Sequence, residues 1–195
     1  MSQRSLRETP SQTAGPYVHI GCLPAMAGLP DVYKTFVGAS PISGGAKGER
    51  ITITGTVLDA HGAPCRDAMI ESWQADAAGV YPGHEGADPA VTGFARFAVD
   101  PKTGEYSLKT VKPGPAARDT TQAPHVALWI VARGINVGLQ TRIYFEDEDN
   151  SVDPLLGRIE QKARRDTLIA TKTAEGRYRF DICLQGEDET VFLDM

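Results

Sequence analysis

The feature that most constrains this chain is an apolar run of seven residues, 126–132 (VALWIVA), with polar residues at both ends. Pro124 and His125 precede the run, and Arg133 and Gly134 follow it. The run is short for a helix and rich in β-branched and aromatic residues, so it predicts a strand buried on both faces. At roughly 3.3 Å per residue, His125 and Arg133 would lie about 25 Å apart and would serve two different places.

Strand and turn signals recur along the rest of the chain. Residues 51–58 and 105–111 alternate apolar and polar positions, which is typical of half-buried strands. Apolar residues at helical spacing indicate one α-helix within 153–165, and a second short helix is expected around 29–37. Further short strands are expected at residues 68–73, 94–99, 141–145, 167–171 and 177–183. The pattern predicts an all-β fold, mainly an antiparallel β-sandwich, with one or two short helices and a long irregular N-terminal arm.

The length of 195 residues suits a single domain. Residues 1–50 are rich in Pro, Gly, Ser and Thr and are expected to form the arm, and residues 51–195 the sandwich. The segment 16–20 (PYVHI) is too apolar for a disordered tail, so the arm is expected to pack against something.

Composition excludes several classes of function. The net charge is −5 and Lys and Arg are not clustered, which argues against nucleic-acid binding. No apolar run of 18 residues is present, so no membrane span is expected, and the N-terminus does not resemble a secretory signal. Cys22, Cys65 and Cys183 are scattered and form no C-x-x-C pair, which favours a reducing compartment, by default the cytoplasm.

Few residues stand out as candidates for chemistry, because no nucleophile-elbow, P-loop, zincin or dinucleotide-binding motif is present. His125, at a strand entrance, either hydrogen-bonds a backbone carbonyl or serves as a metal ligand. Tyr81 either packs or ligates. Arg133 needs an anionic partner, which could be an acidic residue of the chain or the carboxylate of a ligand.

The chain contains a series of short motifs, namely residues 8–17 (ETPSQTAGPY), 71–76 (ESWQAD), 79–81 (GVY), 110–114 (TVKPG), 123–125 (APH), 132–136 (ARGIN), 179–182 (RFDI), 185–187 (QGE) and 189–192 (ETVF). Taken in this order, they resemble the intradiol ring-cleavage dioxygenases over nearly the whole chain. Within that family the motifs are most like those of the α subunits of heteromeric members that act on 3,4-dihydroxybenzoate (protocatechuate). No single motif is specific, but their order and spacing are.

The resemblance implies non-haem Fe(III) held by two tyrosinates and two histidines, hard donors that suit a ferric ion. Tyr81 matches the first tyrosine, but Ala116 stands where the second is expected. His125 matches one histidine of a His-x-His pair, and Ala127 stands at the other position; if His125 is the second member, Ala123 is the gap instead. Two ligands of four should not hold iron. We therefore expect no metal on this chain, with Tyr81 and His125 as vestigial positions and Fe(III) on a homologous β subunit.

The resemblance also implies that this chain completes the substrate pocket of the β subunit, so no catalytic residue is expected on this chain alone. The positions that match the substrate-binding residues are Thr13, Gly15, Pro16, Tyr17 and Arg133. The assembled enzyme would cleave protocatechuate with O2 to 3-carboxy-cis,cis-muconate and would contain several αβ pairs. Two alternatives are a self-sufficient homomeric intradiol dioxygenase and a non-enzymatic β-sandwich binding module.

Overall fold

The computed structural model describes residues 9–34, 36–117 and 121–194. Most of the predicted N-terminal arm is included, but residues 1–8, and with them the first residue of the motif at 8–17, lie outside the described part. The elements in chain order are α1 (Pro16–Cys22), β1 (Arg50–Leu58), β2 (Met69–Gln74), β3 (Phe94–Ala98), β4 (Glu105–Val111), β5 (Ala116–Ala117), β6 (Thr121–Gln122), β7 (His125–Val131), β8 (Leu139–Phe145), the 3-10 helix η1 (Leu156–Arg158), α2 (Lys162–Asp166), β9 (Ile169–Ala174), β10 (Arg177–Arg179) and β11 (Ile182–Cys183).

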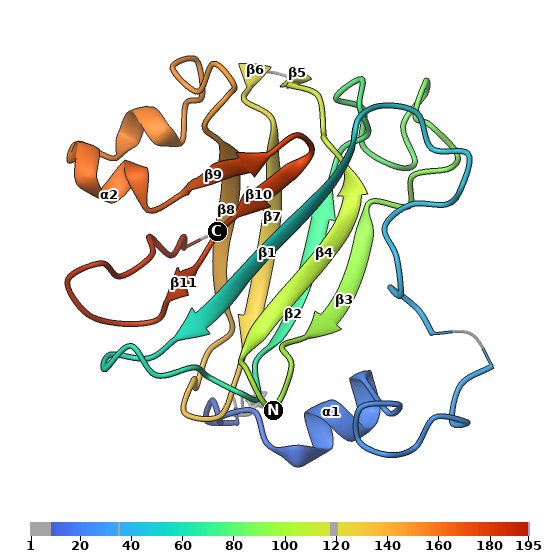
Figure 1. Ribbon diagram of the computed structural model, residues 1–195, viewed down its shortest axis with the longest axis vertical. Coiled ribbons are helices and arrows are strands. Elements are labelled where there is room, and N and C mark those ends of the chain that lie inside the picture. The colour runs from blue at the N-terminus through green and yellow to red at the C-terminus, as the bar shows by residue number, and fades with distance from the viewer. Residues whose placement is uncertain (1–8, 35, 118–120, 195) are drawn as a thin grey trace, which may run out of the picture.

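The strands form two layers, as Figure 1 shows, with β1 and β4 lying in front of β2, β7 and β8. A nine-stranded sheet runs in the order β11-β1-β10-β9-β8-β7-β2-β3, and β4 pairs with β1. Most pairs are antiparallel, while β1 pairs in parallel with β10 and β11, and β8 with β9. The prediction of an all-β, mainly antiparallel fold is therefore confirmed.

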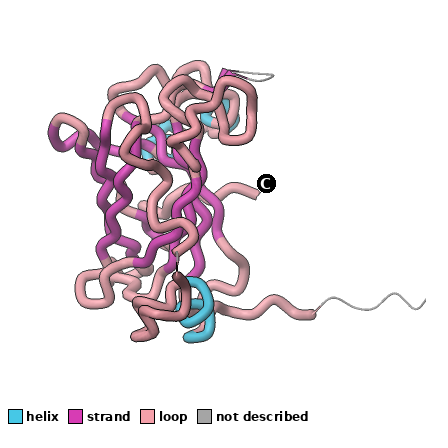
Figure 2. Tube along the Cα trace, turned by 90° about the vertical axis from the view of Figure 1, so that its right-hand side faces the viewer, coloured by secondary structure: helices cyan, strands magenta, loops and turns pink. Residues whose placement is uncertain are grey.

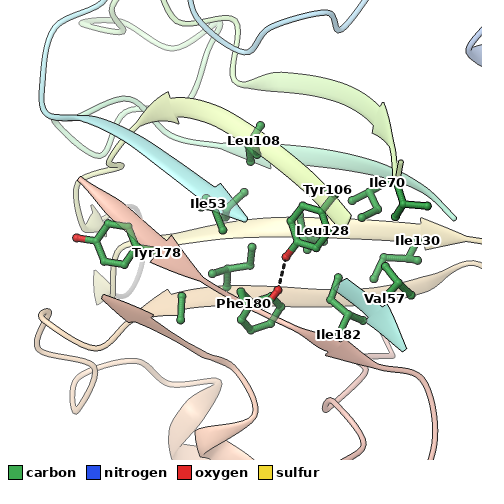
Figure 3. Close-up of a cluster of buried hydrophobic side chains, with 14 of the residues drawn as sticks. Ile53, Val57, Ile70, Tyr106, Leu108, Leu128, Ile130, Tyr178, Phe180 and Ile182 are labelled. Carbon is green, nitrogen blue, oxygen red and sulfur yellow. Dashed lines mark hydrogen bonds between the residues drawn. The ribbon is translucent and has the colours of Figure 1, made fainter. Parts of the chain in front are cut away.

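The core fills the space between the layers. Ile53 and Leu108 come from the front layer and meet Leu128 and other side chains of β2 and β7 (Figure 3). The hydroxyl of the buried Tyr106 donates to the carbonyl oxygen of Phe180 at 2.6 Å, which satisfies a polar group that would otherwise be costly to bury.

The central strand β7 is where it was expected, but it is not buried on both faces. Val126, Leu128 and Ile130 point into the core and are fully or almost fully buried. On the other face, Ala127 is half-buried and Trp129 is 36% exposed, whereas Val131 at the end of the strand is covered by Leu23 and the α1 side chains Val18 and Cys22. A strand with one fully buried face needs apolar residues only at alternate positions. The run from 126 to 132 is apolar at every position, so the aromatic residue Trp129 remains on the outer face.

Both helix predictions need correction. The described residues of 29–37 form turns, with residue 35 outside the described part, and the N-terminal helix is α1 instead. Pro16 stands in its first turn, where a fixed φ and a missing N–H cost nothing. The stretch 153–165 is not one helix but η1 followed by α2. Gly157, a poor helix former, lies within this stretch. The Asp153 carboxylate accepts hydrogen bonds from the N–H groups of residues 155 and 156. The predicted strand 177–183 is likewise divided into β10 and β11.

The helix α1 lies at the end of the layers where β7 finishes, far from β5 and β6 (Figures 1 and 2). Val18 and Cys22 pack against Met69 and Val131 of the sheet, together with the buried Leu23 that follows the helix. The arm is thus attached to its own sandwich. None of the helices in the described part of the chain has the length and apolar character that a bilayer-crossing helix needs.

Candidate functional site

The first candidate site lies at the start of β7, where His125 is only 3% exposed. Its Nδ1 lies 2.8 Å from the carbonyl oxygen of Ala123, which can only accept, so Nδ1 carries the proton. Nε2 is then an acceptor and lies 3.2 Å from the hydroxyl of Tyr81. The backbone-carbonyl alternative for His125 is therefore confirmed, and its other ring nitrogen is bonded to Tyr81.

A loop organised by Asp76 delivers Tyr81 to this place. The buried Asp76 carboxylate accepts the N–H groups of Ala78 and Val80 through Oδ1, both at 2.9 Å, and that of Asp88 through Oδ2. Gly79 has φ +81°, and a Cβ there would lie 2.0 Å from the carbonyl oxygen of Pro115. Glycine is needed at this position on both counts, and the close approach brings the Tyr81 loop against the segment that carries Ala116.

Arg142 of β8 supplies positive charge beside this pair. Its Nη1 donates to Gln122 Oε1 at 2.9 Å, and Ala127 faces it across the β7–β8 ladder. Burial, followed by the charge of Arg142, lowers the pKa of His125 to about 4, and burial raises the pKa of Tyr81. Near neutral pH the pair is therefore an uncharged imidazole and an un-ionised phenol.

The residues present do not fit a four-ligand ferric site. Tyr81 Oη and His125 Nε2 are directed at each other. The other two positions at which the resemblance leads us to expect ligands are Ala116 and Ala127, whose methyl groups cannot bind a metal. Ala116 lines a cavity of about 480 Å³ with Tyr81 and Gln122, and Ala127 lies on the outer face of β7. Within the described ranges, no group of three or more His, Cys, Asp or Glu side chains could hold a metal ion. A ferric ion would need donors that this site lacks.

The second candidate site lies at the other end of β7. Arg133 follows the strand and precedes Gly134, whose φ of +94° turns the chain. The Arg133 side chain is 81% exposed, so its guanidinium lies in solvent rather than against the core. Arg133 Nε lies 3.3 Å from Asp67 Oδ2, which is the ion pair within the chain that was one of the two alternatives for Arg133. An exposed pair of this kind stabilises a fold by at most about 1 kcal/mol.

The N-terminal arm meets Arg133 here. Thr13 Oγ1 accepts the N–H of Gly134 at 2.6 Å and lies 3.3 Å from the carbonyl oxygen of Ala132, so its hydroxyl binds the backbone on both sides of Arg133. A cavity of about 230 Å³ is lined by Ala14, Gly15, Pro16, His19, Asp67 and Arg133.

Four of the five predicted substrate-binding residues, namely Thr13, Gly15, Pro16 and Arg133, thus come together, although 120 positions separate Thr13 from Arg133. Tyr17 follows them on α1 and is exposed. The sequence analysis missed Asp67 and His19. His19 lies in the apolar segment already singled out, whereas nothing near Asp67 in the sequence reveals its contact.

Comparisons with known proteins identify the family of the chain. The family model described as Dioxygenase matches residues 35–186. The chain is 46% identical to the protocatechuate 3,4-dioxygenase alpha chain of Pseudomonas putida, covering 97% of each chain. It is also 35% identical to the protocatechuate 3,4-dioxygenase beta chain of Burkholderia cepacia, over 73% of this chain and 67% of that one.

Among solved structures, the intradiol ring-cleavage dioxygenase of Tetranychus urticae superposes with a TM-score of 0.61 at 15% identity, covering 91% of this chain and 94% of that chain. At this identity the likeness concerns the fold alone. The family model and the full-length relatives together place the chain by sequence. The chain belongs to the intradiol dioxygenase family.

Proposed function

We propose that this chain is the iron-free α subunit of a protocatechuate 3,4-dioxygenase and completes the substrate pocket of a homologous ferric β subunit. The observation that carries the proposal is the likeness to an alpha chain over 97% of both sequences. The likeness to a beta chain of the same enzyme supports a partner built on the same sandwich. The geometry adds that Tyr81 and His125 are bonded to each other and that two ligand positions are alanines.

The iron belongs to the β subunit in this proposal, and bond cleavage takes place there. The contribution of the α chain is to bind and orient the substrate at the mouth of that pocket. Positioning of this kind lowers the barrier because the reacting groups are already aligned when O2 arrives.

Arg133 is the residue that recognises the carboxylate of protocatechuate. Its side chain is exposed, and the planar guanidinium can pair with a carboxylate through two parallel hydrogen bonds. Catechol has no carboxylate, so a site that presents this fork discriminates between the two compounds. Gly15 and Pro16 line the same cavity as Arg133, and Tyr17 follows them on α1. Thr13 holds the arm to the loop that carries Arg133.

The arm, residues 1–50, contributes to the subunit interface in this proposal. One side of α1 packs on the sandwich, but several large apolar side chains of the arm remain exposed, which is costly unless another chain covers them. They are Tyr17, Ile20, Met26, Leu29, Val32, Tyr33 and Val37. We further infer an assembly of several αβ pairs in the cytoplasm, which is consistent with three free cysteines.

The test is expression of the chain with and without a β subunit encoded beside it, followed by counting of iron and assay of protocatechuate cleavage. We expect a complex that contains iron in proportion to the β subunit and cleaves protocatechuate, and an α chain that binds no iron when purified alone. Stoichiometric iron with a tyrosinate-to-iron visible band on the lone chain would favour the homomeric dioxygenase. Failure to form a complex or to cleave the ring would favour the binding module.

A further inference from the structure

The guanidinium of Arg133 is held along one edge only. Asp67 Oδ2 lies 3.3 Å from Nε and forms an ion pair with it, and within residues 9–34, 36–117 and 121–194 neither terminal nitrogen has a hydrogen-bond or ion-pair partner. A guanidinium has five N–H donors arranged around a plane. The edge formed by Nη1 and Nη2 therefore remains free for a second carboxylate while Asp67 keeps the Nε edge.

The position of Asp67 follows from the rigid part of the sheet. Met69 of β2 pairs with Val131 of β7, and both are buried. Asp67 and Arg133 lie two residues beyond this last pair of the ladder, each in a turn, and their side chains meet there as an ion pair. Ala68, which lies between Asp67 and Met69, is completely buried, and this fixes the backbone from which Asp67 projects.

Asp67 is also fixed by its second oxygen. The thiol of Cys65 lies 3.5 Å from Asp67 Oδ1. Burial and the charge of Asp67 raise the pKa of this thiol to about 11, so it is protonated and can donate. The carboxylate is thus held on both sides, while the much longer Arg133 side chain would otherwise sample many rotamers.

We propose that Asp67 is a positioning residue: it holds Arg133 by Nε and so presents the Nη1–Nη2 edge to a carboxylate in the cavity that these two residues line together with the arm. The proposal rests on the function proposed above and deepens it, because it adds a residue that sets the preference for carboxylated catechols. Thr13 fixes the backbone of Arg133, and Asp67 fixes its head group.

Asp67 could instead compete with the substrate for Arg133. Two features favour positioning. The two carboxylates need different edges of the guanidinium, so each can be bonded at the same time. The existing pair is also exposed, at 81% for Arg133 and 35% for Asp67, so water screens the repulsion between Asp67 and the substrate carboxylate.

The test uses the assembled αβ enzyme with Asp67→Asn and Asp67→Ala, and measures kcat and KM for protocatechuate and for catechol. Inhibition constants of 4-hydroxybenzoate and phenol provide a binding readout that requires no turnover. Asp166→Asn is the matched control, because it removes the acidic partner of another exposed pair, with Lys162 at 2.6 Å. We expect Asp67→Ala to raise KM for protocatechuate and the inhibition constant of 4-hydroxybenzoate by about two- to five-fold. The catechol and phenol values and kcat should stay unchanged.

A double-mutant cycle with Arg133→Ala completes the experiment. The Asp67 effect should disappear when Arg133 is absent, because a positioning residue acts only through the residue it positions. A lower KM for protocatechuate in Asp67→Ala would identify Asp67 as a competitor, and equal changes for both substrates would make it merely structural. If Arg133→Ala still raises KM for protocatechuate more than KM for catechol, either of these results overturns only the role of Asp67 and leaves the proposed role of Arg133 intact. If Arg133→Ala changes KM for the two substrates equally, the proposed role of Arg133 fails instead.

Discussion

The two ends of β7 carry polar side chains under opposite conditions. His125 is 3% exposed and both its nitrogens are bonded within the chain, to Ala123 and Tyr81. Arg133 is 81% exposed, has one ion pair, and lies on a cavity bordered by the arm. The first end satisfies its own polar groups, whereas the second presents donors to something outside the sandwich. We call the end at His125 the closed end and the end at Arg133 the open end. The resemblance marks both as functional, and the open end is the better candidate for substrate binding.

The closed end should be visible in the pH dependence of stability. The pKa of His125 is lowered from its ordinary value of 6.5 to about 4 in the folded state, chiefly by burial. Between these values the unfolded chain binds a proton that the folded chain does not, so the free energy of unfolding falls as the pH drops from about 6.5 to about 4. The full effect corresponds to about 3 kcal/mol.

Chemical denaturation across this pH range measures the effect, with His125→Asn as the comparison, because the carboxylates titrate equally in both proteins. The variant should lose less stability than the parent on acidification. Identical pH profiles for the two would mean that His125 is far more accessible to protons than its burial implies.

The open end should respond in binding rather than in stability. Arg133→Ala in the assembled enzyme should raise KM for protocatechuate by about ten- to a hundred-fold, which is the loss of a charge-assisted pair worth about 1.5–3 kcal/mol. Catechol should be affected far less. Steady-state kinetics with both substrates measure this.

Arg133→Lys serves as the control for charge, since it keeps the cation but loses the planar fork, and should fall between the parent and the alanine variant. The free energy of unfolding of Arg133→Ala should change by less than about 0.5 kcal/mol, as for other exposed substitutions. Equal losses on both substrates, or a large loss of stability, would remove the contrast between the two ends.

A smaller effect is expected from Tyr81→Phe, which leaves His125 Nε2 buried without a donor. The cost should be about 1–2 kcal/mol of unfolding free energy, with no change in the preference for protocatechuate over catechol. Tyr33→Phe is the matched control, because it also removes one tyrosine hydrogen bond, to the carbonyl oxygen of Gly21, but at an exposed site. A changed substrate preference in Tyr81→Phe would indicate that the closed end communicates with the pocket.

The sequence predicted the sandwich well because period-two alternation reports directly on burial. β1 and β4 alternate in the structure as they do in the sequence, and β7 lies within one residue of its apolar run. The exposure of Trp129 was missed, because an apolar side chain on an uncovered face looks the same in sequence as a buried one. The division of 153–165 depends on the Asp153 carboxylate, which also accepts from Tyr144, a contact that local periodicity does not report.

The sites were predictable to different degrees. Tyr81, His125, Thr13 and Arg133 could be named because motifs mark them. Asp67 could not, because its contact with Arg133 joins two turns, beside β2 and β7, that only the folded chain brings together. The exposure of Arg133 was also unpredictable, since an arginine at the end of an apolar run can turn either toward the core or into solvent.

The smallest expected effect concerns Thr13, which joins the arm to the open end. Thr13→Val keeps the shape but removes the hydroxyl that binds Gly134 N–H and Ala132 O, and should cost about 0.5–1 kcal/mol locally. Thr13→Ser retains the hydroxyl and should behave like the parent. Hydrogen exchange at the Gly134 amide should become faster in Thr13→Val, and KM for protocatechuate should rise modestly while KM for catechol does not. Unchanged exchange would mean that α1 packing on Met69 and Val131 already holds the arm. In that case Asp67, rather than Thr13, would be the main restraint on Arg133.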